Sequence, residues 1–294
     1  MTDVVIIGGG IIGLAIAREL SNSGLDIIIL EKNDRAGDVT SSRNSGVIHA
    51  GIYYPQNFLK TRLCVEGNKM LYKYASEKNI SHKKYGKYII ATSKEEQSKL
   101  QTILTQGIEN NVEIEMASKE QVLENNPGLN FFEAIYSPSS GVIDVPDFVS
   151  ALEGDIQHFG GLISLRTNFI SARKDNDKFI IKCLSEDKFD VSSKYLVNCS
   201  GLSSEETLNN IEEFPKSRIY KNYFAKGHYF KYSGKSPFTN LIYPISGQHS
   251  LGIHVGFDLA GGIRFGPDMK FVETINYNFD DSLKNKFVKE ISQY

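Results

Sequence analysis

Glycines at positions 8, 10 and 13 have the spacing of a phosphate-binding turn. They follow an apolar run at residues 4–7, and a second apolar run at 27–30 ends in Glu31. In such a turn the first glycine permits the bend, the second lets a pyrophosphate approach the backbone, and the third lets the helix pack on the sheet. We therefore expect Gly8, Gly10 and Gly13 to bind an adenine dinucleotide, with an ordinary glycine-rich turn as the alternative.

Glu31 stands where a carboxylate accepts hydrogen bonds from the ribose diol of a dinucleotide. A carboxylate at this position repels a 2′-phosphate, so the pattern argues against an NADP-type ligand. The helix that starts after Gly10 adds free N–H groups and the positive end of the helix dipole, and both favour phosphate.

The elements that must hold these residues form a strand–helix–strand crossover. Residues 4–7 and 27–30 predict strands, and residues 11–20 predict the helix between them. The pattern further predicts helices at 59–78, 95–110, 119–124 and 145–159, and strands at 88–92, 162–165, 178–184 and 195–199. After Pro215 it predicts strands at 223–232, 241–245, 251–257 and 262–265, separated by turns.

This order predicts an α/β fold made of two interleaved domains. We expect residues 1–80 and 143–212 to form a dinucleotide-binding domain with a parallel sheet of the ββα type. Residues 81–142 and 213–275 are expected to form an α+β substrate domain on a largely antiparallel sheet. Residues 276–294 are expected to be the C-terminal helix of a truncated tail.

Composition excludes several classes of protein. The 33 basic and 35 acidic residues give a net charge of −2, which does not favour nucleic acid. The three cysteines lack CxxC spacing, which argues against a disulfide framework or a zinc site and fits a reducing compartment. The chain has no basic leader, and its longest apolar stretch is too short to cross a membrane. We expect a cytoplasmic protein, with peripheral contact at the inner membrane left open.

A sharper string follows the crossover, SSRNSGVIHAGIYY at residues 41–54. Together with the glycine turn, it resembles the FAD oxidoreductases of the D-amino-acid-oxidase-like superfamily, and within them most the L-2-hydroxyglutarate dehydrogenases (oxidases). Strings at residues 62–68, 226–229 and 251–268 are similar to the same family. The resemblance covers the chain from residue 3 to about 275.

The resemblance implies FAD as the cofactor. The three glycines would hold its pyrophosphate, and Glu31 its adenosine ribose. A loop along the pyrophosphate would then comprise Ser41, Ser42, Arg43 and Asn44, ending in Ser45 and Gly46 near the isoalloxazine. Ser200 and Gly201 would contact the adenosine half. The alternatives are a surface salt bridge for Arg43, a helix cap for Ser41 and Ser42, and a simple buried position for Cys199.

The resemblance also implies a reaction, the oxidation of L-2-hydroxyglutarate to 2-oxoglutarate by hydride transfer to flavin. Electrons would pass on to a quinone or to oxygen. The partners would therefore be a small 2-hydroxy acid and an electron acceptor. Two alternatives stay open: a flavoenzyme for an amino acid or glycerol 3-phosphate, and a truncated flavoprotein without turnover.

Oxidation of a 2-hydroxy acid needs a group that takes the hydroxyl proton, and histidine suits that task because its pKa lies near neutrality. His49 has small neighbours, and His254 is flanked on its own strand face by Gly252 and Gly256. Either could be the base, and each could instead be structural. Candidates for substrate binding are Tyr53, Tyr243 and Arg264, with core packing or solvent exposure as the alternatives.

His228 is expected on the sheet surface or behind the substrate residues. The chain ends at Tyr294, before the Gly-Ile-Arg-Pro and Gly-Ile-Glu-Ser-Pro-Gly-Leu-Thr segments of the family. The carboxylate-binding arginine and the closing wall of the flavin pocket would lie in those segments. Three explanations remain: a truncated reading frame, a second chain that supplies the missing part, and a fragment that binds poorly.

Overall fold

The computed structural model describes residues 1–245 and 252–294. The chain divides into two compact units, which are described separately below. Unit 1 comprises Met1–Asn44 and Val145–Tyr223, and unit 2 comprises Ser45–Asp144 and Phe224–Tyr294.

Three segments, residues 45–80, 143–144 and 213–223, belong to a different unit from the domain in which the sequence analysis placed them. Residues 45–80 lie in unit 2, where Asn68 Nδ2 donates hydrogen bonds to the carbonyl oxygens of His49 and Ser139, both at 3.0 Å. Residues 213–223 lie in unit 1, where the Lys174 N–H donates to the Glu213 carboxylate at 2.8 Å. These hydrogen bonds are among the contacts that each segment makes within its unit.

Unit 1 is built on a six-stranded sheet with the order β10-β11-β12-β1-β2-β9. Strands β12, β1, β2 and β9 run parallel, whereas β10, β11 and β12 form an antiparallel meander. The strands are β1 (Thr2–Ile7), β2 (Ile27–Leu30), β9 (Leu162–Ser164), β10 (Asn168–Asp175), β11 (Lys178–Leu184) and β12 (Lys188–Asn198).

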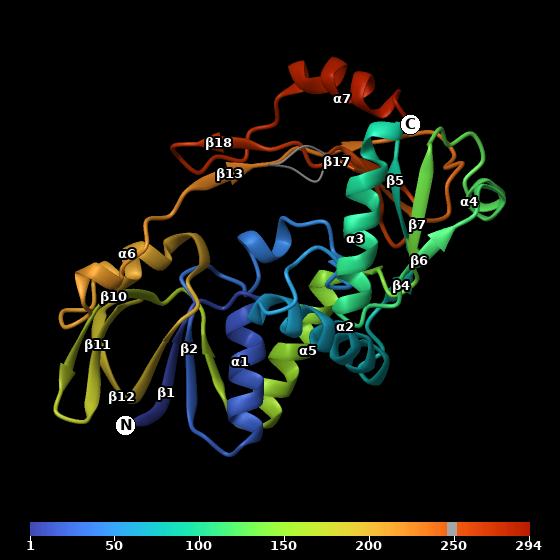
Figure 1. Ribbon diagram of the computed structural model, residues 1–294. Helices are drawn as coiled ribbons and strands as arrows, with labels where there is room; N and C mark the ends of the chain where they lie inside the picture. Colours follow the sequence, from blue (N-terminus) through green and yellow to red (C-terminus); the bar gives the residue numbers. More distant parts are fainter. Residues whose placement is uncertain (246–251) are drawn as a thin grey trace. The chain divides into compact units, whose positions relative to one another are not determined.

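The two central parallel strands, β1 and β2, are short apolar runs whose residues are mostly buried. Helices α1 (Ile11–Asn22) and α5 (Val145–His158) run side by side on one face (Figure 1). Arg18 Nε on α1 donates to the Asp155 carboxylate on α5 at 2.7 Å. Unit 1 also contains α6 (Ser204–Asn209) and the short 3₁₀ turns η1 (Thr40–Ser42), η3 (Gly201–Ser203) and η4 (Lys216–Arg218).

Unit 2 is built on a seven-stranded sheet with the order β14-β17-β16-β15-β5-β7-β6. Its neighbouring strands are antiparallel except for the parallel pair β5 and β15. The strands are β5 (Lys87–Ala91), β6 (Glu115–Ala117), β7 (Glu133–Ser137), β14 (Phe230–Lys231), β15 (Leu241–Pro244), β16 (His254–Phe257) and β17 (Ile263–Gly266). This confirms the expected α/β fold with a largely antiparallel second sheet.

Two smaller sheets complete unit 2. One has the order β3-β8-β4 and the other pairs β13 with β18. Their strands are β3 (Val47–Ile48), β4 (His82–Lys84), β8 (Gly141–Ile143), β13 (Phe224–Lys226) and β18 (Lys270–Val272). The helices are α2 (Leu59–Glu77), α3 (Gln97–Glu109), α4 (Lys119–Asn125) and α7 (Lys284–Ile291), with 3₁₀ turns η2 (Lys94–Glu96) and η5 (Asp281–Leu283).

Helix α7 is part of the core of unit 2. Its Phe287 is buried and its ring lies 4.6 Å from that of Phe230 on β14. No helix in the described part of the chain is long and apolar enough to cross a membrane.

Candidate functional site

The glycine turn of unit 1 has no room for side chains at two of its three positions. Gly8 has a φ of +104°, and a Cβ atom there would lie 2.5 Å from the carbonyl oxygen of Cys199. A Cβ atom on Gly13 would lie 2.0 Å from the carbonyl oxygen of Gly8. The strand end, the turn and the start of α1 therefore pack backbone against backbone, as a dinucleotide-binding crossover requires.

Gly10 differs because its backbone is unstrained and its surroundings are open. A Cβ atom there would meet only the Ser41 hydroxyl oxygen, at 3.2 Å. That oxygen accepts a hydrogen bond from the Ile11 N–H at 3.0 Å, at the amino terminus of α1. The Ser41 hydroxyl oxygen thus accepts a hydrogen bond from an N–H at the start of the helix, next to Gly10. A phosphate oxygen would be bound in the same way. The cradle fits a pyrophosphate.

Glu31 is buried at the end of β2, with 7% of its surface exposed. One of its oxygens accepts the Gly9 N–H at 2.8 Å, and the other accepts the Asn33 N–H at 2.9 Å and the Asn33 Nδ2–H at 2.7 Å. A carboxylate can accept about four hydrogen bonds. One acceptor site therefore remains for a ribose hydroxyl. Asn33 was missed by the sequence analysis because a loop asparagine carries no periodic signal.

The loop after Gly37 is held by hydrogen bonds between its own residues. Ser42 Oγ donates to the Asp38 carbonyl at 2.9 Å, Arg43 donates to the Val39 carbonyl at 3.1 Å, and Asn44 Nδ2 donates to the Ser41 carbonyl at 2.5 Å. In this structure these side chains hold the loop that carries Ser41.

The second expected contact, at Ser200 and Gly201, lies against the glycine turn. The Cys199 N–H donates to the Ile7 carbonyl at 2.8 Å, which holds the end of β12 beside Gly8. Ser200 Oγ donates to Asn198 Oδ1 at 2.7 Å, and Gly201 has a φ of +57°. Burial raises the pKa of the Cys199 thiol, which keeps it protonated.

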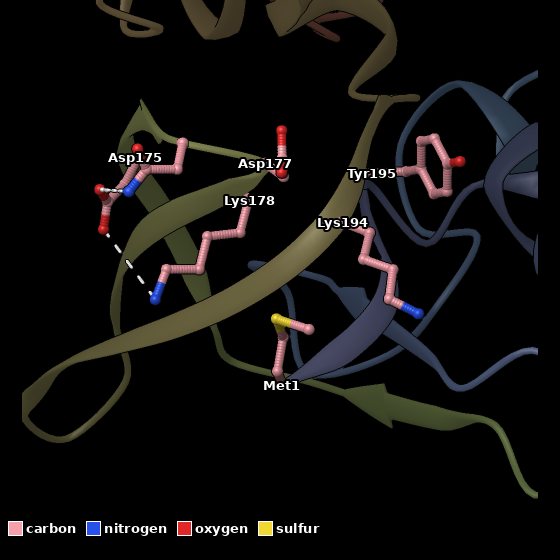
Figure 2. Close-up of a pocket in the computed structure, with 7 residues that line it drawn as sticks. Met1, Asp175, Asp177, Lys178, Lys194 and Tyr195 are labelled. Carbon is pink, nitrogen blue, oxygen red and sulfur yellow. Dashed lines mark hydrogen bonds and ion pairs between the residues drawn. The ribbon is translucent and has the colours of Figure 1, made fainter.

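A separate hollow of about 460 Å³ lies at the other end of β1, lined by Met1, Lys194, Tyr195 and the 175–178 turn (Figure 2). Ligands of open α/β sheets bind outside the carboxyl ends of the parallel strands. Met1 precedes the amino end of β1, so this hollow is not part of the dinucleotide site. In the described residues no group of three or more His, Cys, Asp or Glu side chains could hold a metal ion.

The seven-stranded sheet of unit 2 gathers polar groups on one face. Its register pairs Lys87 with Leu241, Ile242 with Val255, and Gly256 with Arg264. Because side chains alternate between faces, Lys87, Tyr243, His254 and Arg264 lie on the same face. We call these four residues the polar sheet face.

His254 is 2% exposed, and its ring stacks on that of Tyr243 with centroids 3.8 Å apart. Nδ1 lies 3.3 Å from the Gly252 carbonyl, which can only accept, so Nδ1 carries the proton of the neutral ring. Nε2 is then left with a lone pair. Burial, together with the Lys87 charge, lowers the pKa of His254 to about 3. Leu251, expected in the same strand, lies outside the described residues.

His49 has the opposite tautomer. Its Nδ1 accepts the Gly51 N–H at 3.0 Å, so the proton of the neutral ring is on Nε2. The ring stacks on Tyr54 at 5.5 Å and meets Tyr53 edge-on at 6.0 Å. Burial, with the charges of Lys87 and Lys60, lowers the pKa of His49 to about 4. Of the two histidines, His254 thus presents an acceptor and His49 a donor.

Lys87 was missed by the sequence analysis, which began its strand one residue later. It is 1% exposed, and its Nζ lies 4.0 Å from the centroid of the Tyr243 ring and 5.6 Å from that of Tyr53. Burial lowers the pKa of Lys87 to about 7. Lys87 could have been predicted to be buried because it lies on the same strand face as Ile89 and Ala91, which are both buried.

Arg264 is half-buried rather than exposed. Its guanidinium donates to the carbonyl oxygens of Phe257 at 2.9 Å and Ser45 at 3.2 Å, and these bonds orient it over the sheet. Of the two positions expected for His228, the structure excludes the sheet surface. His228 is 6% exposed, and Asp268 accepts both its backbone N–H, at 2.7 Å, and its ring Nδ1–H, at 2.9 Å.

The comparison with known families decides the class. The sequence profile of the FAD dependent oxidoreductases (DAO) matches residues 3–294. The chain belongs to this family. FAD is therefore the cofactor of this DAO-family protein, in agreement with the cradle of unit 1.

Named relatives agree with this assignment, and a solved structure shares the fold. The chain is 34% identical to the mitochondrial L-2-hydroxyglutarate dehydrogenases of Arabidopsis thaliana and Dictyostelium discoideum, over 99% and 90% of its length. It spans 69% and 64% of those two relatives. The FAD-bound L-alpha-glycerophosphate oxidase of Mycoplasma pneumoniae shares the fold with a TM-score of 0.89 at 22% identity, covering 99% of this chain and 78% of that one.

Proposed function

We propose that this DAO-family protein oxidises L-2-hydroxyglutarate to 2-oxoglutarate. Two kinds of observation support the proposal. Relatives that carry the name of this activity are 34% identical to the chain. The polar sheet face of unit 2 supplies the acid–base and cationic groups that a hydroxy acid requires.

The pyrophosphate of the cofactor would be held mainly by backbone groups, and its ribose by a carboxylate. Gly8, Gly10 and Gly13 would bind the pyrophosphate, and Glu31 the ribose. Secondary contacts are proposed for Ser41, Ser42, Arg43, Asn44, Ser200 and Gly201, and Ser45 and Gly46 are proposed beside the flavin ring. When bound, FAD supplies the acceptor for the hydride that leaves C2 of the substrate.

The proton of the substrate hydroxyl would go to His254 Nε2. The observation that carries the proposal is the contact between His254 Nδ1 and the Gly252 carbonyl. It keeps the ring proton on Nδ1 and leaves Nε2 free to accept a proton. In the free protein the pKa of His254 is about 3, so the ring is neutral and can accept a proton. A bound anionic substrate beside the ring would raise this pKa towards neutrality. His49 would donate its Nε2–H to a substrate oxygen.

The carboxylate on the reacting carbon would be bound by Arg264, which lies on β17, the neighbour of the strand that carries His254. Tyr53 and Tyr243 would line the site as neutral phenols. Burial raises the pKa of both hydroxyls, so each keeps its proton and can donate it in a hydrogen bond.

The test is a substrate panel with the FAD-loaded chain. L-2-hydroxyglutarate, its D enantiomer, glycerol 3-phosphate and several amino acids would be assayed with a quinone analogue and with oxygen as acceptors. We expect the L hydroxy acid to have the highest kcat/KM. A higher kcat/KM for an amino acid or for glycerol 3-phosphate would reject the proposal and favour another reaction of the family.

A further inference from the structure

We propose that Lys87 binds the second carboxylate of the substrate, the one remote from the reacting carbon. This makes Lys87 the residue that selects a hydroxydicarboxylate over a hydroxy acid with one carboxylate. The inference rests on the proposed function and adds a specificity-determining residue to it.

The first observation is a buried lysine side chain that has no anionic partner among the described residues. Lys87 is 1% exposed at the start of β5, in the middle of the seven-stranded sheet. Among the described residues no carboxylate oxygen lies within 4.0 Å of its Nζ. A buried ammonium is strongly disfavoured unless an anion pairs with it. A ligand carboxylate would supply that anion.

The second observation is the surroundings of the ammonium group. Its Nζ faces the rings of Tyr243 at 4.0 Å and Tyr53 at 5.6 Å. Aromatic faces hold a cation in place without neutralising it. Both phenols keep their protons, because burial raises their pKa values, so their hydroxyls can donate to a carboxylate that Lys87 attracts.

The third observation is the order of the strands. Arg264 is on β17, adjacent to β16 with His254, whereas Lys87 is on β5, two strands from β16 on the other side. At about 4.8 Å per strand, the backbones of Lys87 and His254 are roughly 10 Å apart. Arg264 is therefore placed for the carboxylate attached to the reacting carbon, and Lys87 for one separated from it by further methylene groups.

The charges that face Lys87 are consistent with an anionic ligand. His49 comes from the loop before α2 and His254 from β16, and the Lys87 charge lowers the pKa of each. The histidines and phenols that face the ammonium are therefore neutral in the free protein. An anion that binds here meets no other negative charge and pairs with the ammonium.

The experiment uses the FAD-loaded chain as wild type, Lys87→Met, Lys87→Arg and the control Lys94→Met, whose lysine is exposed. The measured quantity is the ratio of kcat/KM for L-2-hydroxyglutarate to that for L-2-hydroxybutyrate, which lacks the second carboxylate. We expect Lys87→Met to lower this ratio at least about tenfold, mainly through KM, because it removes one partner of a buried charge pair. Lys87→Arg should restore part of it, and Lys94→Met should leave it unchanged.

A Lys87→Met variant that keeps the wild-type ratio would overturn the proposal while leaving the proposed function intact. A wild type that oxidises neither acid would instead count against the proposed function. In that case tyrosine fluorescence would be titrated with 2-oxoglutarate and 2-oxobutyrate. Stronger binding of the dicarboxylate that depends on Lys87 supports the role of this residue, and equal binding by wild type and Lys87→Met rejects it.

A purely structural role predicts a different pattern. If Lys87 only filled space, methionine would fit as well and both substrates would be affected equally. Circular dichroism and the thermal midpoint of each variant, measured beside the kinetics, show whether the change in ratio occurs in a folded protein.

Discussion

The ring of His254 stacks on the ring of Tyr243, with centroids 3.8 Å apart and planes 20° from parallel. The stack and the Gly252 carbonyl together fix both the orientation and the tautomer of the imidazole. His49 is fixed in the other tautomer by the Gly51 N–H. The sequence left open which histidine acts as the base, and these two hydrogen bonds favour His254.

Replacing the two histidines with glutamine should therefore have unequal effects. A His254→Gln variant loses the proton acceptor, and its kcat should fall by about 10²–10⁴-fold. In a His49→Gln variant the amide N–H can still donate, and its kcat should fall by less than about tenfold. The rate of flavin reduction under anaerobic conditions measures both. Equal losses, or a larger loss for His49→Gln, would contradict the assignment.

The pH dependence of kcat/KM should report Lys87. Burial lowers its pKa to about 7 in the free protein, so the ammonium form is present below this pH and is lost above it. Because kcat/KM follows the ionisation of the free enzyme, its value for L-2-hydroxyglutarate should fall as pH rises above about 7. The groups that face Lys87 are His49, His254, Tyr53 and Tyr243. The histidines are neutral and the phenols protonated around and above pH 7, so their ionisation does not change kcat/KM in this pH range.

A Lys87→Arg variant provides the control for this profile. Arginine stays charged at every accessible pH. The alkaline fall should therefore disappear in this variant, and a fall that persists would assign it to another group.

The open side of Gly10 gives a prediction about cofactor binding. Gly10→Val should fold, since an added Cβ atom meets only the Ser41 hydroxyl, but its branches would occupy the space of the pyrophosphate. FAD affinity should fall by about 10–100-fold. The flavin content of purified protein and a titration with FAD measure this loss. Gly67→Ala on α2, where nothing lies within 4 Å of an added Cβ atom, is the matched control.

The buried His228–Asp268 pair predicts a large effect on stability. Asp268→Ala would leave the backbone N–H and the ring Nδ1–H of His228 without their acceptor. The free energy of unfolding should fall by about 2–3 kcal/mol, which denaturant titration can measure. Exposed Asp187→Ala should change it by less than about 0.5 kcal/mol. Similar losses in both variants would show that the pair contributes little.

The sequence predicted those features that depend on local pattern. The glycine turn was recognisable because its residues are adjacent, and helix α2 was predicted at 59–78 and observed at Leu59–Glu77 because its periodicity is regular. Strand β10 (Asn168–Asp175) was missed because its residues alternate weakly and are mostly half-exposed.

The features that were missed depend on pairing between distant residues. Lys87 is buried because β5 pairs with β15, more than 150 residues later in the chain, with Lys87 opposite Leu241. The acceptor of the buried His228, Asp268, is 40 residues away in the sequence. In both cases the contacts that bury the polar residue come from a distant part of the chain, which local sequence pattern does not reveal.

The central claim is that this chain, loaded with FAD, oxidises L-2-hydroxyglutarate on the polar sheet face. The most direct measurement is a single anaerobic turnover, in which flavin absorbance and 2-oxoglutarate are followed together. The account predicts that the yellow colour of oxidised flavin is lost and that one 2-oxoglutarate forms for each flavin reduced, with the D enantiomer inactive. Flavin that stays oxidised in the presence of saturating, bound L-2-hydroxyglutarate would contradict it.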